Sequence, residues 1–281
     1  MLSEEVRRHC ARVAAGARWV AIDPDALPEP GGVAGLDPGL HYLDAPAEEV
    51  ARYVLVLDTV NFGSGWFEEL HTDTDALTRR LTDHARARGG TWSSAELAGL
   101  GAGEVADVLA LPPEHALTRL YAQALRGLGA FLGARGALEV VAAAGGSAQR
   151  LAARLAEGMP FFADRGFYKR AQITANDLVL AGVAEFADVD RLTVFADNLL
   201  PHVLRTDGVL HYAPELAERV DAGVELPAGE AMEREVRACA LHACEGIAAR
   251  LGVPPRTLDN QLWNRGKDLG GRPHRTRTVY Y

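Results

Sequence analysis

The stretch that decides the fold runs from Pro112 to Ala134 and reads PPEHALTRLYAQALRGLGAFLGA. The two prolines break any preceding element, because proline lacks the backbone N–H that a helix interior needs. Beyond them, apolar residues recur at the three- and four-residue spacing of one helix face. The pattern therefore predicts a long helix over about 114–134.

Similar patterns extend in both directions from this helix, and several have start signals such as Ser3, Ser147 and Pro254-Pro255. The apolar end of 45–61 fits either a helix or a buried strand, and we favour a helix. Residues 22–44, rich in Pro, Gly and Asp, are typical of a long ordered loop. The expected further helices are 3–17, 45–61, 73–88, 94–100, 104–109, 147–157, 170–186, 197–206, 228–251 and 254–266.

These elements predict a mainly α protein, because convincing alternation over several strands is absent from the sequence. The chain has 281 residues, 48% of them hydrophobic and 24% charged, as in soluble globular proteins. We expect one compact helical domain over 1–281 with few or no short strands. Within it, an N-terminal part of about 1–110 packs on a C-terminal part of about 111–281.

Charge and cysteine content restrict the function further. The formal net charge of −9 argues against a nucleic-acid binder, which needs a dense basic surface. Three cysteines, no signal-peptide pattern and no long apolar span indicate a cytoplasmic protein without a membrane segment. Basic residues are 27 Arg and two Lys, so the composition draws attention to Lys169 and Lys267.

The segment 57–66, LDTVNFGSGW, is the first of four that are unusually dense in polar and aromatic residues. An apolar run ends in Asp58 and Asn61, and Phe62 and Trp66 flank a Gly-Ser-Gly turn. Aromatic faces stack on flat rings, and the carboxylate and amide can bind ring edges. The alternative is a helix C-terminus with packed aromatics.

Two further segments place charged groups beside predicted helix starts. FYKRAQ (167–172) has Tyr168 and Lys169 at the start of a helix, which suits either an anion site or a solvated basic turn. FADNLLP (195–201) has Asp197 after an apolar stretch and before a helix. That aspartate fits an N-cap, or a carboxylate that faces a cleft as nucleophile or base.

The fourth segment is HRTRTVYY (274–281), whose alternating Arg and Thr and paired tyrosines indicate a segment docked against the protein body. Arg277 and the hydroxyls of Tyr280 and Tyr281 also suit a phosphate group. The alternative is a packed segment with surface arginines.

Other motifs carry no site. Cys239, His242 and Cys244 lie on one predicted helix, and Cys244 points away from His242, so we expect no metal site. The glycines at 127, 129 and 133 follow no strand and form no dinucleotide fingerprint. No serine lies in a nucleophile-elbow sequence.

Taken together, the four segments resemble the queuosine salvage family, the queuosine 5′-phosphate N-glycosylases. The matching pieces are LDTVNF (57–62), FYKRAQ (167–172), FAD with LP (195–197 and 200–201) and RTVYY (277–281). Matching pieces run from about residue 45 to residue 281 in family order. One departure is Gly63-Ser64-Gly65, where bulkier residues are expected.

The resemblance implies an all-helical fold related to the helix-hairpin-helix DNA glycosylases and hydrolysis of the N-glycosidic bond of queuosine 5′-monophosphate. The released queuine would be salvaged for tRNA modification, without a cofactor. The family likeness makes Asp197 the catalytic carboxylate and Lys169 its partner. The substrate-binding residues implied are Asp58, Asn61, Phe62, Trp66, Tyr168, Arg277, Tyr280 and Tyr281.

The chemistry suits these residues. Cleavage builds positive charge on the ribose, which a fixed carboxylate stabilises. Queuine is a 7-deazaguanine and has no nitrogen at position 7 to protonate, so its departure needs hydrogen bonds elsewhere on the base. Its side-chain amine is cationic and fits a pocket lined with carboxylates. Lys169, Arg277 and the paired tyrosines are the candidates for phosphate binding.

Two alternatives stay open at this point. Residues 97–106 faintly resemble a helix-hairpin-helix, which would suit a DNA glycosylase, but the net charge of −9 opposes it. The same pocket could also belong to a non-catalytic queuine carrier. We expect a small-molecule substrate and no stable nucleic-acid complex, and the sequence leaves the oligomeric state open.

Overall fold

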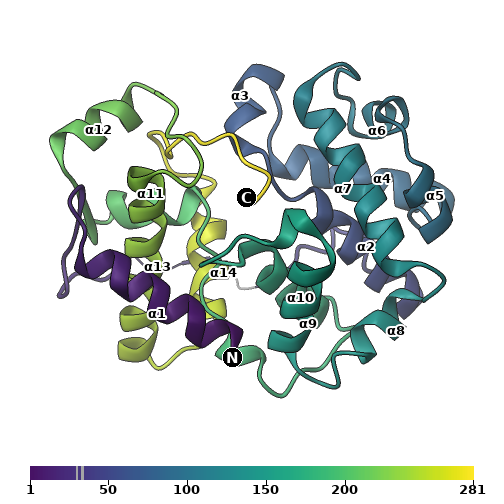
Figure 1. Ribbon diagram of the computed structural model, residues 1–281, viewed down its shortest axis with the longest axis horizontal. Coiled ribbons are helices and arrows are strands. Elements are labelled where there is room, and N and C mark those ends of the chain that lie inside the picture. The colour runs from purple at the N-terminus through teal and green to yellow at the C-terminus, as the bar shows by residue number, and fades with distance from the viewer. Residues whose placement is uncertain (30, 33–34) are drawn as a thin grey trace.

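Helices make up most of the chain in the computed structural model, which describes residues 1–29, 31–32 and 35–281 (Figure 1). The α-helices are α1 (Leu2–Ala15), α2 (Ala47–Val60), α3 (Phe67–Leu70), α4 (Thr74–Arg88), α5 (Ser94–Gly99), α6 (Ala102–Leu109), α7 (Ala116–Leu132), α8 (Ala137–Ala142), α9 (Ala148–Gly158), α10 (Lys169–Leu180), α11 (Leu199–Thr206), α12 (Pro214–Asp221), α13 (Ala231–Leu251) and α14 (Pro255–Gly266). Short 3-10 helices are η1 (Ser64–Trp66), η2 (Pro160–Phe162) and η3 (Val189–Arg191). The prediction of a mainly α fold is confirmed.

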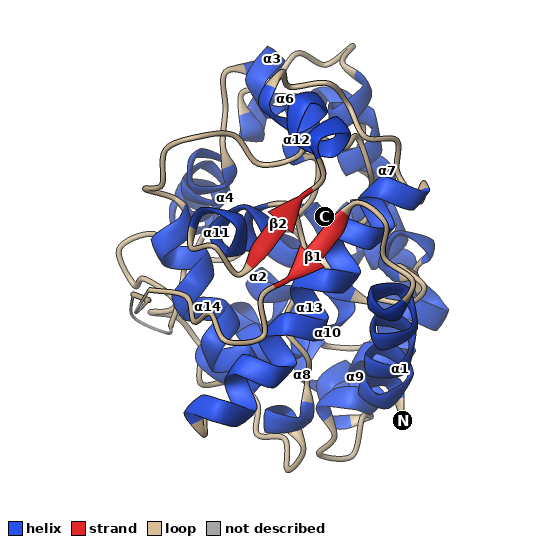
Figure 2. Ribbon diagram, turned by 90° about the vertical axis from the view of Figure 1, so that its left-hand side faces the viewer, coloured by secondary structure: helices blue, strands red, loops and turns tan. Residues whose placement is uncertain are grey.

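One small antiparallel sheet joins distant parts of the chain. Strand β1 (Val20–Ile22) pairs with β2 (Leu210–Tyr212), and Ala21 lies opposite His211 (Figure 2). The backbone bond from the N–H of Ala213 to the carbonyl of Trp19 extends the ladder. The sheet fastens the segment after α1 to the C-terminal half of the molecule.

The long helix α7 shows how the sequence produces the packing. Its buried residues Leu117, Tyr121, Leu125, Leu128 and Leu132 recur every three or four positions and form one apolar face. Gly129 lies on the same face, and a Cβ there would overlap the backbone of α5. The close contact between α5 and α7 therefore depends on that missing side chain.

Most predicted helices are present, with different ends. The segment predicted over 45–61 contains the helix α2 (Ala47–Val60), so the strand alternative is wrong there. The helix predicted over 170–186 ends at Leu180, because Gly182 adopts a left-handed conformation and its N–H bonds back to Val179. The short helices α3, α8 and α12 were not predicted. The predicted loop 22–44 contains Pro30, Val33 and Ala34, which lie outside the described residues.

Buried apolar side chains form two clusters. One draws on residues 42–195, mainly α2, α4–α10, and the other on α1, α11–α14 and the small sheet. The helices that carry the two clusters lie on opposite sides of the molecule in Figure 1. Along the chain the clusters change over mainly near residue 194, and α1 joins the second cluster because it packs on α13. Nowhere in the described residues is a helix long and apolar enough to cross a membrane.

Candidate active site

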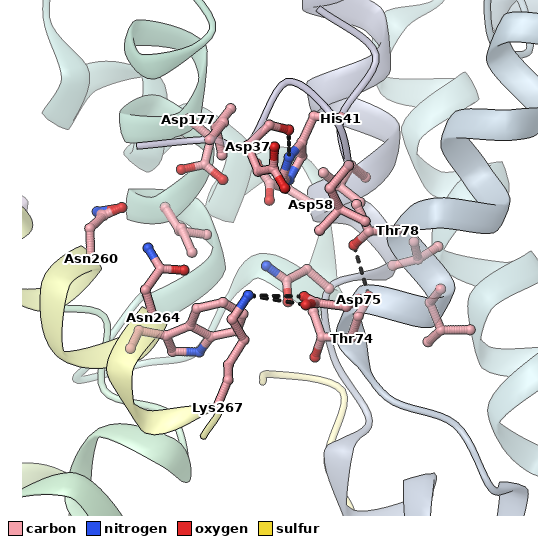
Figure 3. Close-up of a pocket in the computed structure, with 18 of the residues that line it drawn as sticks. Asp37, His41, Asp58, Thr74, Asp75, Thr78, Asp177, Asn260, Asn264 and Lys267 are labelled. Atoms are coloured by element: carbon pink, nitrogen blue, oxygen red, sulfur yellow. Dashed lines mark hydrogen bonds and ion pairs between the residues drawn. The ribbon is translucent and has the colours of Figure 1, made fainter. Parts of the chain in front are cut away.

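A cavity of about 580 Å³ opens between the two apolar clusters. Its walls come from α2, α4, α10, α14 and the loop 35–41, and several of its polar side chains point inward in Figure 3. The volume is in the range of small-molecule sites, which favour places where two packed units meet. The charged and amide residues that line it are Asp37, His41, Asp58, Asn61, Asp75, Arg79, Lys169, Asp177, Asp259, Asn260, Asn264 and Lys267.

One face of α10 supplies the cavity's buried cation. Lys169, Ile173 and Asp177 follow at four-residue spacing, so all three point to the same side. Lys169 is the first residue of the helix and 4% exposed, and Tyr168 before it has a positive φ of 51°. A cation at a helix N-terminus opposes the helix dipole. Burial lowers the pKa of Lys169, and the nearby Asp197 and Asp58 carboxylates oppose that shift.

Asp58, near the end of α2, is the least satisfied polar side chain of the cavity. It is 1% exposed, and neither carboxylate oxygen has a hydrogen-bond partner of good geometry among the described residues. Burial raises its pKa to about 6, while the charge of Lys169 and the nearby Asn61 and Thr174 act in the opposite direction. Burial also raises the pKa of Asp177, and the charge of Asp58 adds to that shift. Two unpaired acceptor atoms beside a cavity are a place for a ligand with two donors.

The facing wall is one side of α14. Asp259, Trp263 and Lys267 recur every four residues, with Lys267 just beyond the helix end. The Lys267 Nζ lies 5.0 Å from the Trp263 ring centroid and 3.1 Å from Oδ2 of Asp75 on α4. Asp259 accepts a 2.7 Å bond from the N–H of Phe195, and burial raises its pKa to about 7.

Asp197 lies directly behind this wall. Its Oδ2 accepts a 3.1 Å bond from the indole N–H of Trp263. Its Oδ1 accepts from the backbone N–H groups of Leu199 and Leu200, at 2.8 and 3.1 Å. The side chain therefore fastens the start of α11, as an N-cap does, and also contacts a residue of the cavity wall.

Phe62 forms the aromatic wall beyond α2, and several groups hold it. The guanidinium of Arg170 lies 4.6 Å from its ring centroid, and the Tyr121 hydroxyl donates to its carbonyl at 2.7 Å. Arg170 also donates to the carbonyls of Asp58 and Thr59, at 3.1 and 2.6 Å. These carbonyls lie in the last turn of α2, where backbone oxygens have no hydrogen-bond partner within the helix. Arg170 is therefore a structural cation of this wall.

The Gly63-Ser64-Gly65 departure has a steric explanation. Gly63 has φ of +95°, and a Cβ there would overlap the side chain of Leu117. A Cβ on Gly65 would overlap the backbone of Thr276. Both glycines therefore allow the turn to pack closely against its neighbours.

The predicted site residues fall into two groups. Asp58, Asn61, Phe62 and Lys169 line the cavity together, and Asp197 contacts its wall through Trp263. The residues placed elsewhere are Trp66, Tyr168, Arg277, Tyr280 and Tyr281. The Tyr168 hydroxyl donates to Glu5 at 3.3 Å, and Arg277 pairs with Glu69 at 2.6 Å.

Sequence reasoning missed most of the α14 wall and the acids around it. The missed lining residues with polar or aromatic side chains include Asp37, His41, Asp75, Asp177, Asp259, Asn260, Trp263, Asn264 and Lys267. The sequence contained three signals of these residues. Lys267 is one of two lysines, and Asp177 lies eight residues after Lys169 on a predicted helix. The four-residue spacing of Asp259, Trp263 and Lys267 was a third signal.

Metal ligation has no basis in the part of the chain that the structure describes, where no group of three His, Cys, Asp or Glu residues could hold an ion. Cys239, His242 and Cys244 lie along α13. Burial raises the pKa of the Cys239 thiol to about 12, so this thiol is a poor metal ligand.

Comparison with known proteins gives a family for this chain. The family model described as queuosine salvage protein matches residues 40–281. A Sphaerobacter thermophilus protein named queuosine 5′-phosphate N-glycosylase/hydrolase is 35% identical over 274 residues, covering 86% of this chain and 84% of that protein. Proteins of the same name from Dictyostelium discoideum and Mus musculus are 37% and 34% identical over 127 and 173 residues. Those matches cover 41% and 51% of this chain, and 40% and 51% of the relatives.

Proposed function

Since the chain belongs to the queuosine salvage protein family, we propose that it hydrolyses queuosine 5′-monophosphate to queuine and ribose 5-phosphate. The released queuine would be available again for tRNA modification. The observation that carries the proposal is Asp58, whose two buried oxygens lie beside a cavity with aromatic walls and have no partner of good hydrogen-bond geometry in the described structure, although Asn61 and Thr174 lie close enough to lower its pKa. A guanine-like edge with adjacent N–H donors satisfies both oxygens.

The base lies, in this proposal, between the aromatic walls. Phe62 and Trp263 line the cavity from the end of α2 and from α14, and aromatic rings are the side chains on which a base stacks. Asp58 accepts hydrogen bonds from the base, and Asn61 beside it binds a second edge. The position of the N–H donors on the base determines the specificity of this recognition. A ligand without those donors would leave the buried carboxylate without hydrogen bonds, which costs free energy.

The side-chain amine of queuine suits the acids of the cavity. Asp37, Asp75, Asp177 and Asp259 line it, against Lys169, Lys267 and Arg79. Burial raises the pKa values of Asp177 and Asp259, so in the empty cavity these acids hold protons more tightly than usual. A cationic ligand stabilises their charged forms, which favours an amine over a neutral group.

In the bond-breaking step, the charged side chains of Asp197 and Lys169 act on the ribose and on the departing base. Asp197 is the catalytic carboxylate of this proposal: it stabilises the positive charge that develops on the ribose as the base departs. Both of its oxygens already accept N–H groups, so electrostatic stabilisation suits it better than attack. Lys169 lines the cavity and donates a hydrogen bond to the departing base, whose position 7 cannot take a proton. Water then adds to the anomeric carbon as the bond to the base breaks: its hydroxyl stays on the ribose and its proton goes to the ring nitrogen that the base releases, which gives ribose 5-phosphate and queuine.

The phosphate is assigned to the rim of the cavity. Lys267 and Arg79 are its exposed cations, and Arg79 has no ion-pair partner among the described residues. Arg277 already pairs with Glu69 and Glu225, at 2.6 and 3.7 Å, outside the cavity lining. Lys267 and Arg79 are therefore preferred for the phosphate, because they line the cavity and Arg277 does not. Free buried thiols at Cys10, Cys239 and Cys244 support a cytoplasmic location for the reaction.

The test is to incubate the pure protein with queuosine 5′-monophosphate and, separately, with queuosine, and to follow free queuine by chromatography and mass spectrometry. Rapid release from the monophosphate supports the glycosylase and its phosphate site together. Tight queuine binding without release from either substrate would contradict the proposal in favour of a non-catalytic carrier. Release of a modified base from duplex DNA would favour a DNA glycosylase.

A further inference from the structure

The segment 274–281 lies against the loop 61–66, which carries two residues of the cavity wall, Asn61 and Phe62. The N–H of Gly63 donates to the carbonyl of Tyr281 at 2.9 Å, and Arg275 Nε donates to the carbonyl of Gly65 at 3.0 Å. Figure 1 shows this end of the chain in the middle of the molecule, between the two groups of helices. The loop therefore depends on contacts with a segment more than 200 residues away.

Tyr281 is the buried end of that segment. It is 3% exposed, and its ring centroid lies 4.3 Å from the guanidinium of Arg237 on α13. Its hydroxyl donates to Oε1 of Glu233 at 2.8 Å and lies 3.2 Å from Nε2 of His274. A hydrogen bond to a buried carboxylate is stronger than one between neutral groups. These contacts fix the position of the carbonyl that binds Gly63.

Arg237 connects the same anchor to the opposite wall. This buried side chain pairs with Asp164 at 2.6 Å and with Glu233 at 3.2 Å. Its Nε donates at 2.9 Å to the carbonyl of Ala196, the residue before Asp197. One buried cluster therefore holds both the loop 61–66 and the backbone beside the proposed catalytic carboxylate.

A second guanidinium, that of Arg170, also joins the segment 274–281 to the cavity wall. Arg170 donates to the carbonyl of Val279 at 2.6 Å, to the carbonyl of Asp58 at 3.1 Å, and stacks on Phe62. Displacement of 279–281 would therefore disturb both Asp58 and Phe62. The absence of a side chain at Gly65 leaves the space in which Thr276 lies.

We propose that Tyr281 is a positioning residue: anchored on Glu233 and Arg237, it holds the loop 61–63 so that Phe62 and Asn61 face the bound base. The role of the segment is therefore to shape the base site, and Tyr281 itself does not bind phosphate. This inference rests on the proposed function for its substrate, but the anchor and the loop are independent of the bond that is cleaved.

The experiment compares Tyr281→Phe with the wild type. This variant keeps the ring on Arg237 and removes only the hydroxyl that binds Glu233. Because the loop then loses its fixed position, base binding weakens equally before and during reaction, so KM rises about tenfold while kcat changes little. The affinity for queuine, measured by calorimetry without turnover, falls by a similar factor.

A second variant and a control separate positioning from stability. Gly65→Ala displaces Thr276 from the other side of the same contact and should raise KM and weaken queuine binding in the same way. Ser147→Ala removes a hydroxyl before α9 that bonds Asp188 at 2.7 Å and accepts from the N–H of Arg150, away from both segments and from the cavity lining. It should lower the unfolding midpoint and leave KM unchanged.

The outcomes are distinct. If Tyr281→Phe and Gly65→Ala lower only the unfolding midpoint and keep the wild-type KM and queuine affinity, the positioning role is wrong. If the wild type releases no queuine, the proposed function fails, and the queuine affinities of the same variants still decide whether the segment shapes the site. Where Gly65→Ala does not fold, Tyr281→Phe gives the answer alone.

Discussion

Replacement of Asp58 by Asn should make the empty protein more stable and a poorer binder. The carboxylate is 1% exposed, and neither oxygen has a partner of good hydrogen-bond geometry among the described residues. Asparagine has nearly the same shape and carries no charge. The change therefore removes a buried charge without creating a cavity.

The size of the effect follows from the pKa. Burial raises the pKa of Asp58 from 3.8 to about 6, so the folded protein holds this proton more tightly than the unfolded chain does. Stability from the protonated form is present at low pH and is lost as the pH rises from about 4 through 6. The shift of about two pKa units corresponds to roughly 3 kcal/mol above pH 7. The amide of the Asp58→Asn variant does not titrate, so the variant keeps that free energy.

Urea unfolding of both proteins at pH 4 and at pH 7.5 measures the difference. The variant's advantage in free energy of unfolding should grow by roughly 2–3 kcal/mol between the two pH values. Its affinity for queuine should fall at least tenfold, because one acceptor of the pair becomes a donor. A variant that is less stable than the wild type at pH 7.5, or whose advantage does not change with pH, would refute the reasoning.

Three further expectations concern activity. Asp197→Asn should lower queuine release at least a hundredfold while urea unfolding changes by about 1 kcal/mol; full single-turnover activity would restrict Asp197 to capping. Lys267→Met should reduce the preference for the monophosphate over queuosine about tenfold, whereas Arg277→Met leaves it unchanged, as a comparison of kcat/KM for the two substrates shows. The pH profile of kcat/KM should rise through about pH 6 as Asp58 loses its proton, and the acidic limb should disappear in Asp58→Asn; a wild-type profile that is flat from pH 5 to 7 would contradict the role of Asp58.

The helical fold was predictable because it depends on local patterns. The spacing of apolar residues in α7 and the capping serine before α9 are visible in the sequence. The ends of helices were less predictable, since Gly182 ends α10 through a left-handed turn that propensity alone does not require. The pairing of β1 with β2 brings together segments about 190 residues apart, and three-residue strands leave no clear periodicity.

The site was predictable where the sequence departs from an ordinary pattern. Asp58, Asn61 and Phe62 follow an apolar run, Lys169 is one of only two lysines and begins a helix, and all four line the cavity. Asp259 and Trp263 lie in an ordinary amphipathic helix, and their chemistry arises only where α14 faces α10 across the cavity. Sequence spacing within one helix cannot show which helix lies opposite.

The paired tyrosines show where segment chemistry and three-dimensional position differ. A hydroxyl-rich segment beside Arg277 suited a phosphate, and sequence reasoning assigned the tyrosines to it. In the structure, Tyr281 is buried against Arg237, and Arg277 pairs with Glu69 and Glu225. The segment was correctly predicted to dock on the protein body, but which of its side chains meet solvent depends on the whole fold.

Binding and stability are coupled in this site through its buried acids. In the empty cavity Asp58, Asp177 and Asp259 are buried, and burial raises the pKa of each. A base with adjacent N–H donors supplies hydrogen bonds to Asp58, and its cationic side chain supplies a positive charge near all three acids. The same ligand should therefore add more stability to the protein at pH 7.5 than at pH 5, because more of these acids would carry an uncompensated charge without it. A neutral purine without the amine lacks the stabilisation by charge, so we expect a higher affinity for queuine than for guanine, which calorimetry with the two bases measures.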